Sequence, residues 1–370
     1  MEMMSLEECC EILDSMRIPI TASNRKEGIY PYYGANGIQD HVADYIFDDE
    51  LVLLAEDGGN FGSKTRPIAY RVSGKCWVNN HAHVLKPKEG LNVDFLCYSL
   101  MFYNTEGLVN GATRQKLTQT TMRKMLIPNL SIENQLYIVN QLNKLLKIIE
   151  LRKKEIQQLD NLTKARFVEL FGDAIHNDKG WENDTVEKLC KEIYGGGTPS
   201  KSHPEYYEDG DIPWVSSKDM KTDVLTDSQI KINQLGVDNS TARMIPINSV
   251  IMVIRSGILK HTLPVAINAV PITVNQDLKV FIPNERVLTR FLAIQFKMHE
   301  KDILSGVRAV TADNIEFNSL KQRELIVPPI ELQQEYVTFL EQIDKSKVAV
   351  QKALDETQIL FDSLMQKYFG

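Results

Sequence analysis

The chain has 370 residues, more than the roughly 250–300 that a single hydrophobic core usually serves, so at least two domains are expected. Its composition, 43% hydrophobic and 25% charged, is typical of a soluble globular protein and argues against a disordered one. The longest strictly apolar runs have five residues, whereas a membrane-spanning helix needs about 20, and the five cysteines include no C-x-x-C pair. We therefore expect a cytoplasmic protein with reduced thiols and no membrane contact.

The net charge of −7 speaks against a nucleic-acid partner, but the charges are unevenly distributed. No acid occurs between Asp57 and Glu89, from Gly107 to Ile132, or between Asp238 and Asp277, and each of these windows carries several basic residues. Local positive stripes of this kind are compatible with phosphate contacts. The alternative is that these charges only coat a solvated surface.

In chain order, the pattern predicts short helices and strands followed in each half by one long helix. Helices are expected at Leu6–Leu13, Val93–Tyr103, around Met122–Met125 and at Val287–His299. Strands are expected at Leu51–Ala55, Cys76–Val78, Val84–Leu85, Val250–Ile254, Val265–Ile267, Ile272–Val274 and Lys279–Ile282. No regular β-α-β alternation is present, so a doubly wound sheet is not expected.

The strongest signal is an internal repeat. When the chain is shifted by 198 residues, Ser131–Gly172 falls on Pro329–Gly370 without a gap, and ten of the 42 positions are identical. Upstream segments correspond at smaller offsets: Leu51–Ala55 matches Val250–Ile254, and Arg114 has the same setting as Arg308. This layout predicts domains at residues 1–127 and 173–327, separated and followed by helices at 128–172 and 328–370.

Each long helix has an apolar seam with steps of three and four residues, which is typical of a coiled coil. The predicted seam residues are Leu142, Leu145, Ile149, Ile156, Leu159, Leu340, Ile343, Val350, Leu354, Phe361 and Leu364. A helix of about 40 residues is roughly 60 Å long and would overhang its own domain. We therefore expect the two helices to pair antiparallel about a pseudo-twofold axis; the alternative is that each lies on its own domain.

No constellation for catalysis is found in the sequence. The stretch Gly59–Thr65 is similar to the sequence pattern of a phosphate-binding loop, but Ser63 separates the glycine from the lysine, so the pattern is not complete. His81 and His83 would share one face of a strand without a third metal ligand. We expect no enzyme activity, no metal site and no cofactor in this chain.

The remaining motifs favour recognition. They are Pro31–Ile38 (PYYGANGI), Ala55–Gly58 (AEDG), Val78–Leu85 (VNNHAHVL), Gly195–Ser200 (GGGTPS), Asp211–Ser217 (DIPWVSS) and the two proline-entered helices that end in Phe-Gly. In this order and duplicated, they resemble the specificity subunit of type I restriction–modification systems, over the whole chain. The resemblance implies an α+β protein in which two target-recognition domains each read one half of a split, asymmetric double-stranded DNA site.

The resemblance also implies partner subunits. The paired helices would dock methyltransferase subunits that use S-adenosylmethionine, and restriction subunits that use ATP and Mg²⁺ would join the complex. DNA methylation and cleavage would then belong to the partners, and this chain would supply the base-reading role.

Candidate DNA-facing residues are the polar and basic side chains in and around these motifs. In the first domain they are Arg25, Tyr33, Asn36, Lys64, Asn79, Asn80, His81, Arg114 and Lys116. In the second they are Lys201, Ser216, Ser217, Lys218, Arg255, Lys260, His261, Asn275, Gln276 and Arg308.

Two other functions stay open. A nuclease or methyltransferase with an unrecognised site would need acids or a cofactor loop that the sequence does not show. A coiled-coil scaffold or regulator would use the helices to hold proteins, and it would lack the steep salt dependence of a DNA-binding protein.

Overall fold

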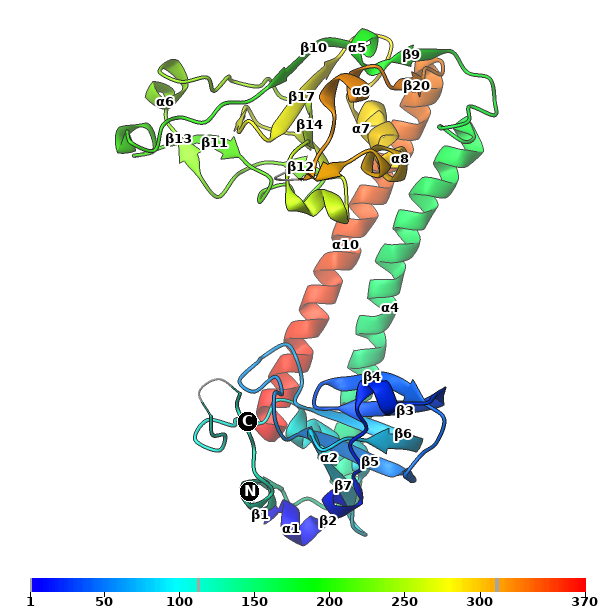
Figure 1. Ribbon diagram of the computed structural model, residues 1–370, viewed down its shortest axis with the longest axis vertical. Helices are drawn as coiled ribbons and strands as arrows, with labels where there is room; N and C mark the ends of the chain where they lie inside the picture. Colours follow the sequence, from blue (N-terminus) through cyan, green and yellow to red (C-terminus); the bar gives the residue numbers. More distant parts are fainter. Residues whose placement is uncertain (1, 112–113, 310–312) are drawn as a thin grey trace. The chain divides into compact units, whose positions relative to one another are not determined.

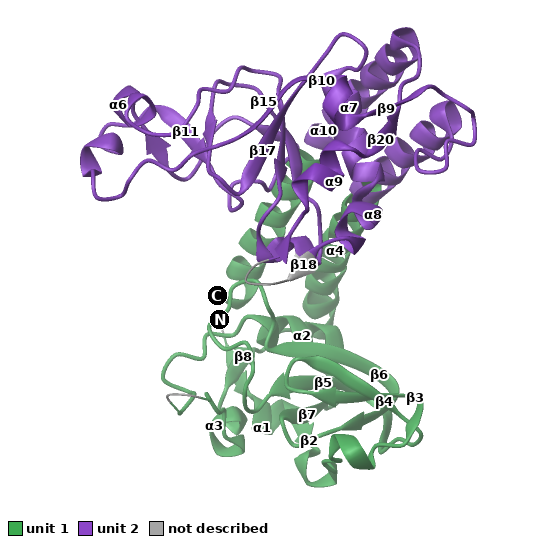
Figure 2. Ribbon diagram, turned by 45° about the horizontal axis from the view of Figure 1, so that its top comes forward, with its two compact units in different colours: residues 1–155, 350–370 green, residues 156–349 purple. Residues whose placement is uncertain are grey.

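The computed structural model describes residues 2–111, 114–309 and 313–370, with the side chains of residues 308–309 also outside the described part. Figure 2 shows two compact units, one of residues 1–155 and 350–370 and the other of residues 156–349. Each unit combines a mixed α/β domain with a segment of each long helix. None of the described helices is long and apolar enough to cross a membrane.

The first unit is built around one mixed sheet (Figure 1). Its elements are β1 (Met3–Ser5), α1 (Leu6–Cys9), β2 (Cys10–Ile12), β3 (Glu27–Gly34), β4 (Gly37–Val42), β5 (Phe47–Ala55), β6 (Ala69–Val78), β7 (Ala82–Pro87), α2 (Val93–Met101), α3 (Gln119–Arg123), β8 (Leu126–Pro128) and the first part of α4 (Ile132–Phe171). The sheet order is β2-β7-β5-β6-β3-β4, and β3 runs parallel to β6 while the other neighbours are antiparallel. The uninterrupted apolar run Leu51–Ala55 has no polar face, and as part of the inner strand β5 it is completely buried.

The second unit divides its strands between two main sheets. Its elements are β9 (Asn183–Thr185), α5 (Val186–Leu189), β10 (Cys190–Gly195), β11 (Ile212–Val215), β12 (Val224–Leu225), β13 (Lys231–Ile232), α6 (Gln234–Asp238), β14 (Val250–Val253), β15 (Val265–Asn268), β16 (Thr273–Val274), β17 (Leu278–Pro283), α7 (Thr289–Met298), α8 (Glu300–Ser305), β18 (Arg308–Ala309), β19 (Asp313–Asn314), α9 (Phe317–Lys321), β20 (Glu324–Ile326) and the first part of α10 (Ile330–Phe369). The sheets have the orders β10-β17-β14-β15-β12 and β13-β11-β16.

The topology of the two units repeats as the sequence does. The β1–α1–β2 segment, with β1 paired to β8, corresponds to β9–α5–β10, with β9 paired to β20. In both units the next strand pair is antiparallel, β2 with β7 and β10 with β17. The parallel pair β3–β6 corresponds to β11–β16, and the long strand β6 is replaced by the two strands β15 and β16. This break divides the six-stranded sheet of the first unit into two sheets in the second.

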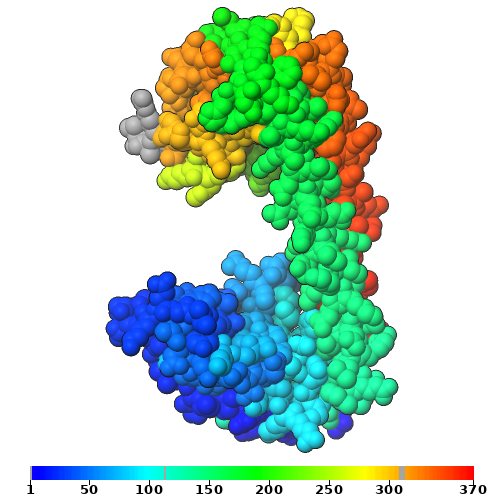
Figure 3. Space-filling model, turned by 90° about the vertical axis from the view of Figure 1, so that its right-hand side faces the viewer, coloured from blue at the N-terminus to red at the C-terminus, as the bar shows by residue number. Residues whose placement is uncertain are grey.

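Within each unit, the segments of α4 and α10 lie side by side and run antiparallel. In the second unit, Lys347 pairs with Asp160 at 2.6 Å, and Arg166 pairs with Glu335 at 2.6 Å further along α4. In Figure 3 these parts of α4 (green) and α10 (orange-red) are adjacent on the surface. In the first unit, Arg152 of α4 donates to the carbonyl of Ala353 and to the hydroxyl of Thr357 on α10.

The predicted seam residues all lie on covered faces of these helices. Leu142, Ile149, Leu340, Ile343, Leu354 and Phe361 are buried, and Leu145, Ile156, Leu159, Val350 and Leu364 are half-buried. Toward the helix ends the same faces also pack on the domains. Phe361 contacts Tyr98 of α2 with ring centroids 6.5 Å apart, and in the second unit Phe171 contacts Phe291 of α7 at 4.9 Å.

A buried glutamine in the first turn of each long helix fixes it to its domain. The Gln135 Oε1 accepts the Asn92 N–H at the start of α2 (2.8 Å), and its Nε2 donates to the carbonyls of Gly90 (3.0 Å) and Leu130 (2.8 Å). Gln333, its repeat partner, accepts the Leu288 N–H at the start of α7 (2.9 Å) and donates to two carbonyls in the same way. The repeat therefore preserves this junction as well as the seams.

Two sequence predictions need correction. The expected helix Leu6–Leu13 stops at Cys9, because Cys10–Ile12 pairs with β7 as strand β2. The sequence pattern also missed the β3–β4 hairpin, whose strands carry tyrosines and glycines in place of an apolar run. The long helices α4 and α10 begin at Ile132 and Ile330, and the compact units divide both helices between them.

Candidate nucleic-acid interface

A cluster of charged side chains lies where β5 ends in the first unit. The Oδ1 of Asp57, two residues beyond the strand, is 2.5 Å from Nδ1 of His81 and accepts from Nη2 of Arg114 at 3.0 Å. Beside it, Nζ of Lys116 pairs with Glu56 at 3.0 Å. Three predicted DNA-facing residues, His81, Arg114 and Lys116, are thus brought together from separate parts of the chain.

The backbone around this cluster is tightly joined. The Asn36 side chain, from the β3–β4 turn, donates to the Gly58 carbonyl at 3.0 Å. Gly58 has a φ of +63°, and a Cβ there would lie 3.2 Å from Nε of Arg114. A glycine at this position therefore supplies the turn and allows the guanidinium to lie against the loop.

A buried ionic network adjoins the cluster and is joined to it through Glu56. His83 Nδ1 lies 2.7 Å from Oδ2 of Asp14, its Nε2 lies 2.9 Å from the Leu117 carbonyl, and Arg17 Nη1 donates to Glu56 at 2.6 Å. Although burial opposes ionisation, the hydrogen bond and charge of His83 lower the pKa of Asp14, and Arg17 and Lys116 lower that of Glu56. The network holds Glu56 in place, and Glu56 in turn holds Lys116.

Asp14, Glu56 and His83 also have the spacing of metal ligands, with one ligand atom each within 4.8 Å of the others. However, the Arg17 guanidinium contacts both carboxylates, at 2.6 Å from Glu56 and 3.5 Å from Asp14. A cation between these groups would meet an arginine. The arrangement therefore fits a buried salt-bridge network better than a metal site.

The second unit has a cluster at the corresponding strand end, after β14. Arg255 donates from Nε (2.6 Å) and Nη2 (2.5 Å) to Oδ1 of Asp277. The Asn275 side chain orients this acid, because it donates to Oδ2 at 3.1 Å and accepts the Asp277 N–H at 3.1 Å. Nearby, Lys260 lies 3.8 Å from Asp313.

Backbone pairing gives the exact correspondence between the two clusters. In the first unit Asp57 forms a β-bridge with Lys116, and in the second Arg255 forms one with Asn314. The backbone N–H groups of the preceding residues also correspond: that of Glu56 donates to the carbonyl of His81, and that of Ile254 donates to the carbonyl of Asp277. Asp57 therefore corresponds to Arg255, and His81 corresponds to Asp277.

This correspondence corrects two sequence matches. Ala55 is equivalent to Val253 and not to Ile254, a shift of one residue that the similar apolar runs concealed. Arg308 pairs with Asn314 in β18–β19, as Asn110 pairs with Lys116, so it occupies the position of Asn110 and not that of Arg114. The side chain of Arg308 lies outside the described residues, so its role stays a prediction.

The charges at these equivalent positions are exchanged between the units. The first unit has an acid at the strand end, Asp57, and takes its bases from the neighbouring turn and loop. The second has the base there, Arg255, and takes its acid from the neighbouring turn. Each unit nevertheless presents one exposed arginine held by one aspartate: the side chains of Arg114 and Arg255 are 59% and 48% exposed.

Other candidate residues lie outside the clusters or point inward. Asn79 and Asn275 are 3% and 7% exposed and bond to the backbone of the adjacent turn, so their placement favours structural support over the expected DNA contact. Arg25 stacks on Tyr32 and pairs with Asp40, and Tyr33 stacks on Tyr70. Burial raises the pKa of Tyr33, in keeping with a packed ring.

The remaining candidates differ in their accessibility. Ser216 accepts the Lys218 N–H and donates to Asp219, Ser217 is half-buried, and Gln276 is exposed and accepts from Thr198. Asn80, Lys201, Lys218 and His261 are exposed, and the structure gives their side chains no hydrogen bond or ion pair within the described part of the chain. As DNA contacts, all of these residues stay predictions.

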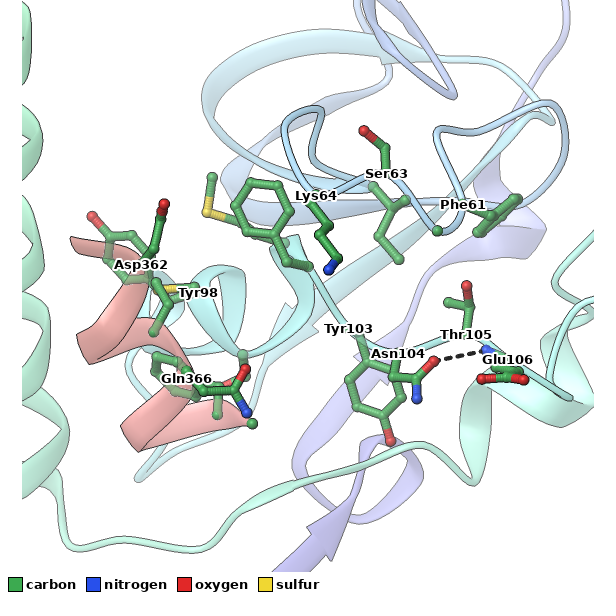
Figure 4. A pocket seen from close by; sticks show the side chains of 18 of the residues that line it. Phe61, Ser63, Lys64, Tyr98, Tyr103, Asn104, Thr105, Glu106, Asp362 and Gln366 are labelled. Carbon is green, nitrogen blue, oxygen red and sulfur yellow. Dashed lines mark hydrogen bonds between the residues drawn. The ribbon is translucent and has the colours of Figure 1, made fainter. Parts of the chain in front are cut away.

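Lys64 lines a pocket of about 720 Å³ in the first unit (Figure 4). The pocket lies between the Phe61–Lys64 loop, the end of α2 with its following loop, and the last turns of α10. Its lining is mixed, with aromatic rings, Lys64 and the two acids Glu106 and Asp362. The balance of charge gives no reason to assign the pocket an anion.

Sequence reasoning missed the acids that hold the exposed bases, Glu56, Asp57, Asp277 and Asp313. Acid-free windows direct attention away from such residues, and three of these acids stand at or just outside the edges of the windows. A charged residue directly after a fully apolar strand would have been the signal, because the chain returns to solvent there.

Comparison with known proteins agrees with this architecture. The model of the type I restriction modification DNA specificity domain matches residues 1–161 and again residues 178–357. The EcoR124I/EcoR124II specificity subunit of Escherichia coli is 29% identical over 87% of this chain and 76% of its own length. A putative type I restriction enzyme specificity subunit of Haemophilus influenzae is 28% identical over 92% of this chain and 86% of its own.

Solved structures share the fold. The S subunit of the type I system from M. genitalium matches with a TM-score of 0.62 at 14% identity, covering 100% of this chain and 96% of its own. A chain from a study of type I complex assembly matches with a TM-score of 0.59 at 15% identity, covering 100% and 97%. With two domain matches that span most of the sequence, the chain belongs to the type I restriction–modification DNA specificity family.

Proposed function

We propose that this chain reads a split, asymmetric DNA site, with each unit contacting one half-site, for a complex that methylates and restricts DNA. The observation that carries this proposal is the pair of equivalent clusters, each with an exposed arginine held by an aspartate at the end of the central strand. Because the two units differ in sequence, the two half-sites should differ in sequence as well.

Exposed cations in the two units would supply phosphate contacts. Arg66, Lys201 and Lys218 are exposed and form no ion pair within the described residues, so their charge is available to a polyanion. Such contacts position a protein on DNA without reading sequence. Binding should therefore weaken steeply as salt rises.

The long helices would dock methyltransferase subunits. On α4 in the first unit, Tyr137, Ile148 and Leu151 are exposed although they share one face of the helix by their spacing. The covered seam of α4 lies on other positions, so this apolar face is left for a partner. An apolar stripe on an otherwise polar helix is typical of protein association.

The chemistry would belong to the partners. Methyl transfer from S-adenosylmethionine and ATP- and Mg²⁺-dependent cleavage would take place on subunits that bind those cofactors. This chain would bind none of them and would act by fixing which DNA sequence is presented.

The test is to co-express the chain with its methyltransferase subunit in a host without adenine methylation and to sequence the genome for methyladenine. A split, asymmetric motif with a fixed gap is expected. A motif with one symmetric half-site would mean that a single unit reads DNA. An assembled complex that methylates nothing would favour the scaffold function.

A further inference from the structure

The exchanged charge pairs assign a specific base contact to each unit. This base contact rests on the proposed DNA-reading function and adds to it the residues and the base involved. The fold brings one arginine to each of the two equivalent clusters by different routes. Arg114 comes from the loop before Lys116, whereas Arg255 follows strand β14 directly.

Each guanidinium is held on one side and open on the other. Asp57 accepts from Nη2 of Arg114, while Asp277 accepts from Nε and Nη2 of Arg255. The Nη1 group of each arginine has no hydrogen-bond partner within the part of the chain that the structure describes. With side chains about half exposed, both arginines keep donors accessible to an external acceptor.

The aspartates are themselves fixed, which makes each arginine a preorganised donor. Asp57 is close to His81 at 2.5 Å, and Asp277 is held by the side chain of Asn275. Ordering a long flexible side chain such as arginine costs about 2 kcal/mol in rotamer entropy. Because the aspartate already holds the arginine, part of this cost does not have to be met when DNA binds. A loose phosphate contact would not need this second level of support.

We propose that Arg114 and Arg255 each read one guanine, Arg114 in the half-site bound by the first unit and Arg255 in that bound by the second. Guanine presents two acceptors, O6 and N7, in the major groove, and the paired N–H groups of arginine match them. A carboxylate at the same place would favour cytosine, but here each acid is already neutralised by its base. The contact is therefore made by the arginine.

Substitutions at the two arginines test this assignment in the intact methyltransferase complex. Arg114→Gln and Arg114→Lys should each relax one guanine position in one half-site, with a loss of preference for guanine of about 5- to 150-fold, read from methyladenine sequencing. The lysine variant is informative because it keeps the charge and loses the paired donors. Arg255→Gln and Arg255→Lys should relax one guanine in the other half-site.

Matched arginines provide controls. Arg123 pairs with Glu7 at 3.2 Å in the first unit, and Arg243 pairs with Glu192 at 3.4 Å in the second, and neither arginine is a member of a cluster. Arg123→Gln and Arg243→Gln should leave the motif unchanged. Asp57→Asn should relax the same position as Arg114→Gln, to a smaller extent, because the arginine is present but less firmly oriented.

Three results separate the outcomes. If the Arg114 variants lower methylation at every site equally and leave the motif intact, or if they change nothing, the guanine assignment is wrong. If Arg114→Lys behaves as wild type, the arginine contacts phosphate and not a base. If the wild-type complex itself yields no split motif, the proposed DNA-reading function has failed, whatever the variants do.

Discussion

The buried glutamine at the start of α4 offers a sharp test of how the long helix is fixed to its domain. Replacing Gln135 with methionine keeps the length of the side chain and removes three hydrogen bonds at once. These are the Asn92 N–H bond at 2.8 Å and the bonds to the carbonyls of Gly90 and Leu130 at 3.0 and 2.8 Å. Gln135 is almost fully buried, so water cannot replace them.

The expected cost follows from the three groups left without a partner. An unsatisfied buried polar group costs about 1–3 kcal/mol, and the lower value for each of three groups gives about 3 kcal/mol. At the start of α2 this corresponds to an increase of about 150-fold in local opening. Hydrogen–deuterium exchange of the full chain, followed on the amides of Asn92 and the first turn of α2, measures that increase.

Gln333→Met is the matched control, because it removes the same set of bonds at the start of α7. Each substitution should accelerate exchange at its own helix and leave the other unchanged. Gln135→Glu should accelerate exchange at least as much as Gln135→Met, because its buried carboxylate would face the carbonyls of Gly90 and Leu130 without a donor. An increase below about fivefold at α2, or an equal increase at α2 and α7, would mean that the Gln135 hydrogen bonds do not fix α4 to its domain.

Four further predictions follow from the same structure. Leu354→Asp should lower the free energy of unfolding by about 3–5 kcal/mol and abolish recognition of the spaced site. Lys352→Asp, on the exposed face of α10, should do neither. A soluble Leu354→Asp variant with the wild-type motif would mean that the apolar seam is not needed for recognition. Leu151→Asp should weaken methyltransferase binding at least tenfold, measured by calorimetry, with an unchanged melting temperature; equal affinity would exclude this face of α4 as the docking surface. Arg66→Ala should reduce the slope of log affinity against log salt by about one without changing the motif, and an unchanged slope would mean that Arg66 contacts no phosphate. Asp14→Asn should cost about 3 kcal/mol near neutral pH. Because the folded-state pKa of Asp14 is lowered below 3.8, wild type should lose this advantage only as pH falls below about 4 through that lowered pKa, and a constant difference down to pH 2 would contradict it.

The repeat and the long helices could be predicted from the sequence because both depend on local pattern. The seams follow from steps of three and four residues, and Gln135 and Gln333 stand at identical places in two copies that align without a gap. Strands β5 and β14 were also predictable, since five consecutive apolar residues need burial on both faces. In each case the information lies within a few helical turns or one strand.

The clusters were only partly predictable because they depend on pairing between distant segments. Arg114, His81 and Lys116 were expected at the surface, but the acids that hold them lie 24 to 60 residues away in sequence and are brought close by the register of β5 with its neighbours. The exchanged charges of Asp57 and Arg255 were concealed by a one-residue shift between similar apolar runs. A sequence comparison favours matching apolar residues, whereas hydrogen bonds decide the register.

A photocrosslinking amino acid placed at Asn80 and, separately, at Gln276 tests most directly whether each unit reads its own half-site. These exposed residues occupy equivalent positions, each beside the turn that carries His81 or Asp277. With the methyltransferase complex bound to its mapped site, the crosslinker at residue 80 should label one half-site and that at residue 276 the other. Labelling of the same half-site from both positions would contradict the claim that each unit reads its own half.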